Sequence, residues 1–383
     1  MTKPISKRLL VPSIALIICL PWINAIFKFI PNPNLENRAF ASFPTAQLEN
    51  LDHYPLQLDT FISDNFSLRA ASMQAYGRIN LYGFKKSPIP RHVYFGKDGW
   101  MFFTGNELAT FDGSASFRQG QTDSIITKLK YRKKYLSDRG IEYYLVVLPV
   151  KNMIYADMQS EALRALRKKN RTDFFIENVS KAIPDLPLID IRDDLQEARK
   201  IEPWSPLSFK TDNHWNRLGA FHGATAVLRG MKENGANVRV PDYKDYHKDS
   251  VKNFTGNLAM FAGLQGVIKE WDYILSPKNP PQAKQIENIP CEVPVFSNSW
   301  EYQMHYQNKD TTLAKVLFIR DSFGSSMLGV LAEGCGESLY IFDEWKYGLN
   351  KDWIEKYKPK IMVQLVLEKH LEHLLYSTPY PEG

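Results

Sequence analysis

The sequence predicts an α/β protein in which helices cover a mostly parallel sheet. Apolar runs with the length of buried strands recur along the chain, and helical segments separate them. In addition, cations followed by a long apolar run at the N-terminus predict a transmembrane helix ahead of the sheet. The 383 residues are enough for a large core, and contents of 44% hydrophobic and 13% aromatic residues argue against extensive disorder.

The first thirty residues differ in character from the rest of the chain. Lys3, Lys7 and Arg8 precede the uncharged run Leu9–Phe27, whose 19 residues nearly cross a hydrocarbon core of about 30 Å. We expect residues 1–30 to form a single-pass anchor with a cytoplasmic N-terminus and an exported C-terminal part. A cleaved signal peptide and a buried core helix are the alternatives; the small-residue cleavage pattern of the former is poor.

Residues 31–90 are expected to form a lead-in region. Prolines at 31 and 33 end any helix that leaves the membrane, and a helical pattern follows over Leu68–Leu81. Residues 93–103 predict a hairpin, because two β-rich halves flank Lys97-Asp98-Gly99 and glycine permits the positive φ of such turns.

From about residue 120, helical and strand patterns alternate. Gly140 ends the first helix, and Pro149 ends the first apolar strand. The expected strands are Tyr143–Leu148, Pro187–Ile191, Lys315–Ile319, Leu339–Phe342 and Ile361–Leu367, and the expected helices are Thr122–Asp138, Phe174–Ala182, Leu218–Met231, Ser322–Leu331 and Trp353–Tyr357. Residues 235–312 interrupt the alternation, and we expect long loops there.

The net charge and the cysteine content exclude few classes of function. The net charge of +6 is too small to indicate a nucleic-acid partner. Of the three cysteines, Cys19 lies in the apolar run, while Cys291 and Cys335 lie in the expected exported part. The latter two could form a disulfide in an oxidising compartment, but the sequence does not establish that they are close enough.

Two short segments contain residues suited to nucleophilic catalysis. In the second, Ile319–Gly324, Ser322 directly follows a predicted strand and opens a predicted helix. Sites in parallel sheets form at the carboxyl ends of strands, and amides at a helix N-terminus can stabilise an oxyanion. A helix-capping role for Asp321 or Ser322 is the simpler interpretation of this segment alone.

The first segment, Lys210–Asn216, supplies the partners that an activated serine needs. Asp212 and His214 are two residues apart, so both side chains face one side of an extended segment. A carboxylate can then orient the imidazole, and the imidazole can remove the serine proton. Taken alone, a structural histidine and a core-packing Trp215 remain the default interpretations.

Metal catalysis is a weaker hypothesis. Asp212, His214 and His222 could be ligands, as could His370 with His373, but the chain has no CxxC and no HExxH motif. A solvated helix face explains the His370–His373 pair more simply. We therefore expect neither a metal nor a cofactor.

Several strings together resemble the SGNH-hydrolase-like proteins of the alginate O-acetyltransferase group. The resemblance covers roughly residues 35 to 370 and depends mainly on Asp-x-His-Trp at 212–215 and Asp-Ser-Phe-Gly at 321–324. Supporting strings are Gly96–Phe102, Glu36–Arg38, Asp64–Phe66, Pro149-x-Lys151 and Thr255–Leu258. In ordinary SGNH hydrolases the serine precedes the histidine; the reversed order here is similar to that of the alginate group, which looks like a permuted version of the fold.

The resemblance implies an O-acetyltransferase that moves acetyl through an acyl-serine onto hydroxyls of a cell-surface or secreted polysaccharide. It implies Ser322 as nucleophile, His214 as base and Asp212 as the orienting acid, within a catalytic domain over residues 91–383. It further implies a bacterial inner-membrane, single-pass protein with its catalytic domain in the periplasm. A membrane-bound O-acyltransferase would supply the acetyl group.

The residues around Ser322 leave the details of oxyanion binding, and the function itself, open. Arg320 stands where the group often has glycine, and it could either crowd the oxyanion region or add a donor. We expect Arg320, Gly324, Asn257 and Trp215 to contribute to substrate or oxyanion binding. An SGNH-type carbohydrate esterase and a catalytically degenerate scaffold of a polysaccharide assembly are the alternative functions.

Overall fold

A computed structural model describes residues 7–35, 39–296 and 299–375. It divides the chain into two compact units. The first comprises Met1–Tyr94 with Thr255–Lys269, and the second comprises Phe95–Phe254 with Glu270–Gly383. The segment Thr255–Lys269 thus belongs with the lead-in rather than with the surrounding sequence. Lys3 and the Glu36–Arg38 string lie outside the described residues.

The first unit is helical. It contains α1 (Lys7–Phe27), α2 (Tyr54–Asp64), α3 (Arg69–Arg78), the π-helix η2 (Ile79–Phe84) and α11 (Asn257–Phe261). The helical pattern expected over Leu68–Leu81 is confirmed by α3 and η2. A Cβ at Gly77 would lie 2.7 Å from the Ala262 carbonyl oxygen, so only glycine allows α3 to pack this closely on the turn after α11.

The expected transmembrane helix is not supported. Among the described residues, no helix is long and apolar enough to cross a membrane. Helix α1 contains Pro12 and Pro21, and its Asn24 side chain is buried. Asn24 Nδ2 donates to the carbonyls of Ile30 at 3.1 Å and Ser67 at 2.9 Å, so polar contacts tie the end of this helix to the lead-in.

The second unit is built around a seven-stranded sheet with strand order β4-β3-β11-β9-β10-β8-β7. The first five strands in this order run parallel, and β8 and β7 continue the sheet antiparallel. The strands are β3 (Glu142–Leu148), β4 (Leu188–Asp190), β7 (Ala283–Ile286), β8 (Gln303–Asn308), β9 (Lys315–Arg320), β10 (Glu337–Phe342) and β11 (Ile361–Leu367). The expected α/β class with a mostly parallel sheet is confirmed.

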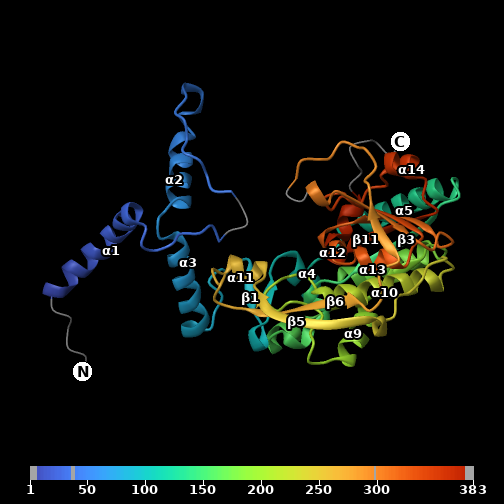
Figure 1. The fold of residues 1–383 in the computed structure, drawn as a ribbon, viewed down its shortest axis with the longest axis horizontal. Coiled ribbons are helices and arrows are strands. Elements are labelled where there is room, and N and C mark those ends of the chain that lie inside the picture. The colour runs from blue at the N-terminus through green and yellow to red at the C-terminus, as the bar shows by residue number, and fades with distance from the viewer. Residues whose placement is uncertain (1–6, 36–38, 297–298, 376–383) are drawn as a thin grey trace. The chain divides into compact units, whose positions relative to one another are not determined.

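Helices pack on both faces of this sheet, as the apolar strands predict. The main ones are α5 (Gln121–Ser137), α8 (Arg171–Ala182), α10 (Arg217–Glu233) and α14 (Lys351–Tyr357), and the others are α4 (Asn106–Asp112), α6 (Lys151–Ile154), α7 (Glu161–Leu166), α9 (Arg192–Ile201), α12 (Ser322–Ser325) and α13 (Leu328–Glu333). Figure 1 shows α5 on one side of the sheet and α10 on the other.

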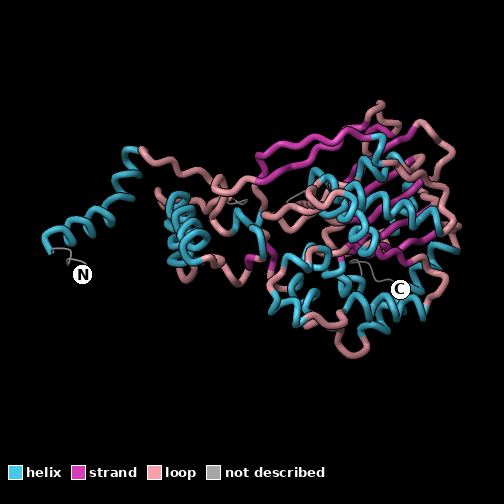
Figure 2. Tube along the Cα trace, turned by 90° about the horizontal axis from the view of Figure 1, so that it is seen from below, coloured by secondary structure: helices cyan, strands magenta, loops and turns pink. Residues whose placement is uncertain are grey.

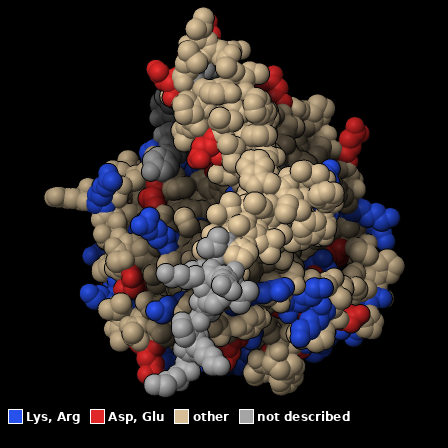
Figure 3. All heavy atoms as spheres, turned by 90° about the vertical axis from the view of Figure 1, so that its left-hand side faces the viewer, with Lys and Arg blue, Asp and Glu red and all other residues tan. Residues whose placement is uncertain are grey.

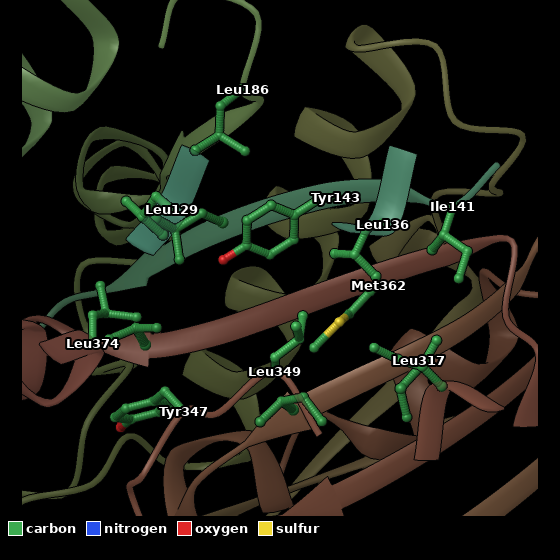
Figure 4. Close-up of a cluster of buried hydrophobic side chains, with 14 of the residues drawn as sticks. Leu129, Leu136, Ile141, Tyr143, Leu186, Leu317, Tyr347, Leu349, Met362 and Leu374 are labelled. Carbon is green, nitrogen blue, oxygen red and sulfur yellow. The ribbon is translucent and has the colours of Figure 1, made fainter. Parts of the chain in front are cut away.

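The core explains why the strands are apolar throughout. Tyr143, Leu145 and Val147 join a buried cluster with residues of α5, α8 and α14 (Figure 4). The alternate residues of the same strand, Tyr144 and Val146, are also buried, and α10 packs against this strand. A strand covered on both faces needs apolar residues at every position, because successive side chains point to opposite faces.

The stretch expected to be long loops is instead rich in strands. Residues 235–312 contain β7, β8 and a two-stranded antiparallel ribbon of β5 (Tyr246–Phe254) and β6 (Glu270–Pro277). Figure 2 shows this ribbon as a pair of long strands separate from the main sheet. The sequence pattern concealed β5 because most of its residues are exposed and polar, so it lacks the alternation of a half-buried strand.

Smaller features also bear on the sequence predictions. The expected hairpin is present as β1 (Val93–Phe95) and β2 (Met101–Phe103). Cys291 and Cys335 are both free, with Cys335 buried and Cys291 partly exposed, so they do not form a disulfide. In the face seen in Figure 3, cationic and anionic side chains are interspersed, in keeping with the modest net charge.

Candidate active site

The turn between β9 and α12 presents Ser322 at the carboxyl edge of the sheet. Strand β9 ends at Arg320, Asp321 is the N-cap, and Ser322 is the first helical residue. The buried Asp321 carboxylate accepts the Phe323 amide at 2.8 Å on one oxygen and the Tyr347 hydroxyl at 2.8 Å on the other. Burial raises the pKa of Asp321, and these two donors oppose that rise by stabilising its ionised form.

A second loop brings the histidine to this turn. His214 Nε2 lies 3.1 Å from Ser322 Oγ, and His214 Nδ1 lies 2.7 Å from Asp212 Oδ1. The same Asp212 oxygen accepts the His214 backbone amide at 2.9 Å, which fixes the two-residue turn. The structure thus brings together the three residues that the sequence selected, although 108 positions separate His214 from Ser322.

This arrangement has the chemistry of an activated serine. With the Nδ1 proton donated to Asp212, Nε2 is left as the acceptor facing the hydroxyl of Ser322. Asp212 is only 4% exposed, so its charge acts on the imidazole in a medium of low dielectric constant. His214 and Ser322 are partly exposed, which leaves the reacting atoms accessible to a substrate.

A buried lysine fixes the loop that precedes His214. Lys151 Nζ donates to the carbonyl oxygens of Phe209, Lys210 and Asp212, the first two at 3.1 and 3.3 Å. Burial lowers the pKa of Lys151 to about 8, and the carboxylate of Asp212 acts in the opposite direction. One cation therefore fixes the backbone of the loop and also lies near the charge of Asp212.

The same loop is held from another side by Glu270, the first residue of β6. Its carboxylate accepts the backbone amides of Lys210 at 2.6 Å and Thr211 at 2.7 Å. Hydrogen bonds from a carboxylate to backbone amides are charge-assisted and comparatively strong. The loop that carries Asp212 and His214 is consequently fixed by ionic side chains on both sides rather than by regular secondary structure.

Trp215 and Asn216 connect the histidine loop to the rest of the fold. The buried Trp215 ring donates from Nε1 to the Phe323 carbonyl at 3.0 Å, so it joins the histidine loop to the serine turn. Asn216 caps α10 by accepting the Gly219 amide at 3.0 Å. A Cβ at Gly219 would lie 2.0 Å from the Leu207 carbonyl oxygen, so this position requires glycine.

The first amides of α12 differ in their availability to an oxyanion. The Phe323 amide donates to the Asp321 side chain at 2.8 Å, and the Gly324 amide donates to the Asp321 carbonyl at 3.1 Å. Both are therefore used within the turn. Within the part of the chain that the structure describes, the Ser322 amide meets no acceptor, which leaves it as a candidate donor to a bound substrate.

Arg320 is directed into the protein rather than left at the surface. It is fully buried, and its guanidinium donates to the Glu301 carbonyl at 2.7 Å and to Ser325 Oγ at 2.6 Å. Burial lowers the pKa of Arg320, while the Glu301 carboxylate at 3.3 Å favours its charged form. These contacts account for a charged side chain two residues before Ser322.

The remaining candidate residues belong to other elements of the chain. Asn257 opens α11 in the first unit, so its role in oxyanion or substrate binding stays a prediction. His222 lies on α10, and burial lowers its pKa. His370 stacks on His373 at 4.8 Å, and burial lowers the pKa of His370 to about 3. Among the described residues, no group of three or more His, Cys, Asp or Glu side chains is arranged to hold a metal ion.

Comparison with known proteins identifies the class. A family model described as the SGNH hydrolase-like domain of the acetyltransferase AlgX matches residues 93–288, just over half of the chain. The match includes Asp212 and His214 and ends before Ser322. The chain therefore belongs to this family and contains an acetyltransferase-type SGNH-like domain. No curated protein matches the chain in sequence.

Solved structures with TM-scores above 0.5 show the same fold at low sequence identity. The structure of Bacillus cereus PatB1 with a sulfonyl adduct is 12% identical with a TM-score of 0.55, covering 75% of this chain and 97% of that one. A DHHW family protein from Eubacterium siraeum is 14% identical with a TM-score of 0.51, covering 74% and 93%. The O-acetyltransferase domain of Pseudomonas putida AlgJ is 14% identical with a TM-score of 0.47, covering 73% and 92%.

Several residues of the site escaped the sequence argument. Tyr347, Glu270 and Glu301 carry no local motif, because each acts through a contact with a distant segment. Lys151 entered the sequence argument only through the string Pro149-x-Lys151, without a role, although its place after the buried strand β3, at the edge where sites form, could have indicated one. A lysine there is either solvated or held by carbonyl oxygens, and only the fold distinguishes the two.

Proposed function

We propose that this protein transfers acetyl groups through an acyl-serine onto hydroxyls of a cell-surface or secreted polysaccharide. The observation that carries the proposal is the His214 Nε2 to Ser322 Oγ distance of 3.1 Å, with Asp212 at 2.7 Å from the other ring nitrogen. Membership of an acetyltransferase family supports transfer of this group rather than another.

The proposed reaction has two half-reactions of the same form. His214 Nε2 takes the Ser322 proton as Oγ bonds to the acetyl carbonyl carbon, and the imidazolium then returns that proton to the departing donor group. In the second half-reaction, Nε2 takes a proton from a sugar hydroxyl, whose oxygen attacks the acyl carbon. Ser322 Oγ leaves and regains the proton, so the enzyme is restored.

The Ser322 amide is the proposed donor to the oxyanion of both tetrahedral intermediates. It belongs to the same residue as the nucleophile, so it lies close to the carbon that Oγ attacks. Removing one such donor has cost about 3–4 kcal/mol of transition-state stabilisation where it has been measured. Asn257 remains a second proposed contributor.

The donor and the location of the reaction follow from the same proposal. We propose that a membrane-bound O-acyltransferase supplies the acetyl group and that the second unit acts in the periplasm. The cations and the apolar segment at the N-terminus support export. A C-terminal alkaline phosphatase fusion should be active in cells, and an inactive but stable fusion would contradict the periplasmic location.

Replacement of the nucleophile tests the function. Ser322→Ala should abolish transfer of acetyl from an acetyl ester to an oligosaccharide, because the proposed acyl intermediate forms on its Oγ. Ser326→Ala, an exposed position just after the same helix, is the matched control and should retain transfer.

Mass spectrometry after phenylmethylsulfonyl fluoride treatment should place the label on Ser322. Transfer that persists in Ser322→Ala would reject the acyl-serine route, and an unlabelled Ser322 in wild type would favour a degenerate scaffold.

An esterase is the second candidate, because His214 has 28% of its side chain exposed and water can approach its Nε2. Acetate release can be measured with and without oligosaccharide present. Acetyl-sugar formation supports the transferase, whereas acetate release that oligosaccharide does not alter supports the esterase.

A further inference from the structure

A cavity of about 540 Å³ lies in the second unit beside the loop that leads to the histidine. Its lining includes Asp98, Trp100, Tyr155 and residues Pro203 to Pro206. Ligand pockets commonly measure about 300–1,000 Å³, so the cavity is large enough for a small ligand or one part of a polymer. None of the three residues Asp212, His214 and Ser322 lines it.

The cavity has a rigid aromatic wall and an exposed aromatic edge. Trp100 and Tyr155 stack with ring centroids 4.1 Å apart, and both are buried. The Tyr155 hydroxyl also accepts the Leu207 amide at 2.6 Å, which fixes the ring to the loop. Trp204, in contrast, is 76% exposed. Its indole borders the cavity, and Trp side chains, with an apolar face and an N–H group, are enriched at binding surfaces.

Polar and cationic groups complete the lining. The lining includes the cationic residues Arg199, Lys200 and Lys210 and the polar residues Asp98 and Gln196. Lys210 Nζ donates to the Asp98 carbonyl at 3.1 Å, whereas Arg199 and Lys200 form surface ion pairs with Asp157 and Glu197. The exposed Lys200 pair contributes about 0–1 kcal/mol, so a ligand can compete for this cation, whereas the Arg199 side chain is only 20% exposed and also donates to the Ile154 carbonyl.

This combination favours a carbohydrate over an apolar ligand. A pyranose ring has a C–H face that packs on an indole and a rim of hydroxyls that needs donors and acceptors. The indole of Trp204 can pack against this C–H face, while Asp98, Gln196 and the cations can form hydrogen bonds with the hydroxyls. A cavity for an apolar ligand would have few polar groups in its lining.

The cavity shares structural elements with the catalytic loop. Lys151 Nζ lies 5.6 Å from the centroid of the Trp100 ring and donates to the Asp212 carbonyl. The Met101 amide donates to the Lys210 carbonyl at 2.9 Å, so the segment after Trp100 is bonded to the same loop. The cavity wall and the histidine loop are thus parts of one connected structure.

We infer that this cavity is a saccharide subsite that holds part of the acceptor polymer beside the catalytic loop, with Trp204 as its stacking platform. The inference rests on the proposed acetyl transfer, because it assigns the bound saccharide the role of acceptor. Saccharide binding itself does not depend on turnover, so it can be tested separately.

Binding is measured by titration calorimetry on the full chain carrying Ser322→Ala, which prevents turnover. The probes are cellohexaose, xylohexaose, chitohexaose and hexagalacturonate. At least one should bind, and adding Trp204→Ala should weaken that binding about tenfold or more, with partial recovery in Trp204→Phe. Trp22→Ala is the matched control, because Trp22 is 74% exposed and lies outside the cavity. Circular dichroism checks that each variant folds.

Kinetics on chains with intact Ser322 give the second readout. Trp204→Ala should raise the KM for the acceptor at least five times more than it lowers the rate of acylation by p-nitrophenyl acetate. Equal effects on both, no effect on acceptor KM, or failure of every probe to bind would overturn the subsite. Binding that depends on Trp204 without any acetyl transfer would instead count against the proposed function and leave the saccharide site standing.

Discussion

At the scale of single residues, Tyr347 holds Asp321, the residue before Ser322. Its hydroxyl donates to the buried Asp321 carboxylate at 2.8 Å and lies 3.3 Å from His370 Nδ1. Tyr347 adopts a φ of 47°, which is costly for an aromatic residue, by about 1–3 kcal/mol. The neighbouring Asp343 carboxylate accepts the Gly348 amide at 2.9 Å and so supports this loop. Strain retained beside a site suggests a role in positioning.

Tyr347→Phe tests this role. Loss of the hydroxyl removes one donor from Asp321, so we expect kcat to fall about tenfold with little change in the KM for the acetyl ester. Stability should fall by about 1–2 kcal/mol. Tyr340→Phe is the matched control: it removes a buried hydroxyl that donates to the Leu328 carbonyl at 3.3 Å. Urea unfolding and steady-state kinetics measure both effects. An equal loss of kcat in the two variants would contradict a specific role for Tyr347.

At the scale of elements, the start of α10 determines where the histidine loop lies. Asn216 caps this helix and also donates from its side chain to the Pro206 carbonyl at 2.6 Å. Gly219 then lets the helix approach the Leu207 carbonyl closely. The helix cap and this glycine therefore fix the end of the histidine loop, in addition to the contacts that Lys151 and Glu270 make with the residues before His214.

Gly219→Ala should displace this loop. The added Cβ would lie 2.0 Å from backbone, which cannot yield as a flexible side chain can, so we expect a loss of more than about 2 kcal/mol in unfolding free energy and a large loss of activity. Gly329→Ala in α13 is the control, since no atom lies within 4 Å of its added Cβ. Thermal unfolding should leave this control unchanged or slightly stabilised. A stable, active Gly219→Ala protein would refute the close approach.

At the scale of the whole sheet, the carboxyl ends of the parallel strands gather buried charged residues. Glu368, directly after β11, accepts the Val150 amide at 2.8 Å and the Thr172 hydroxyl at 2.9 Å. Burial raises the pKa of Glu368 to about 7, against the partial opposition of Arg192. The carboxyl thereby links the ends of β3 and β11 to α8.

The raised pKa of Glu368 predicts that the stability of the protein depends on pH. Its folded pKa lies above its ordinary value of 4.5, so its stabilising contribution is complete below pH 4.5 and is lost as the pH rises through 7. The unfolding free energy of wild type minus that of Glu368→Gln should fall by about 3 kcal/mol between pH 4.5 and pH 7. Guanidinium titrations at both pH values measure it. A difference that stays constant or grows with pH would show that Glu368 is not held neutral.

The sequence by itself determined the parallel α/β sheet and the candidate catalytic set. Strands buried on both faces must be apolar throughout, and a serine at a strand end or an Asp-x-His string is a local pattern that one segment displays. The β5–β6 ribbon was missed because its exposed residues carry no such pattern. The predicted membrane span rested on the apolarity of a single segment, whereas the structure ties the end of that helix to the lead-in through Asn24.

Only the tertiary structure decided how the site is held together. The contacts of Lys151, Glu270 and Tyr347 with the two loops join positions far apart in the chain. Long-range contacts of this kind depend on which strands become neighbours, and no single segment of the sequence determines the strand order. The Trp204 cavity belongs to this second group, because a hollow exists only where distant segments fail to fill the space between them.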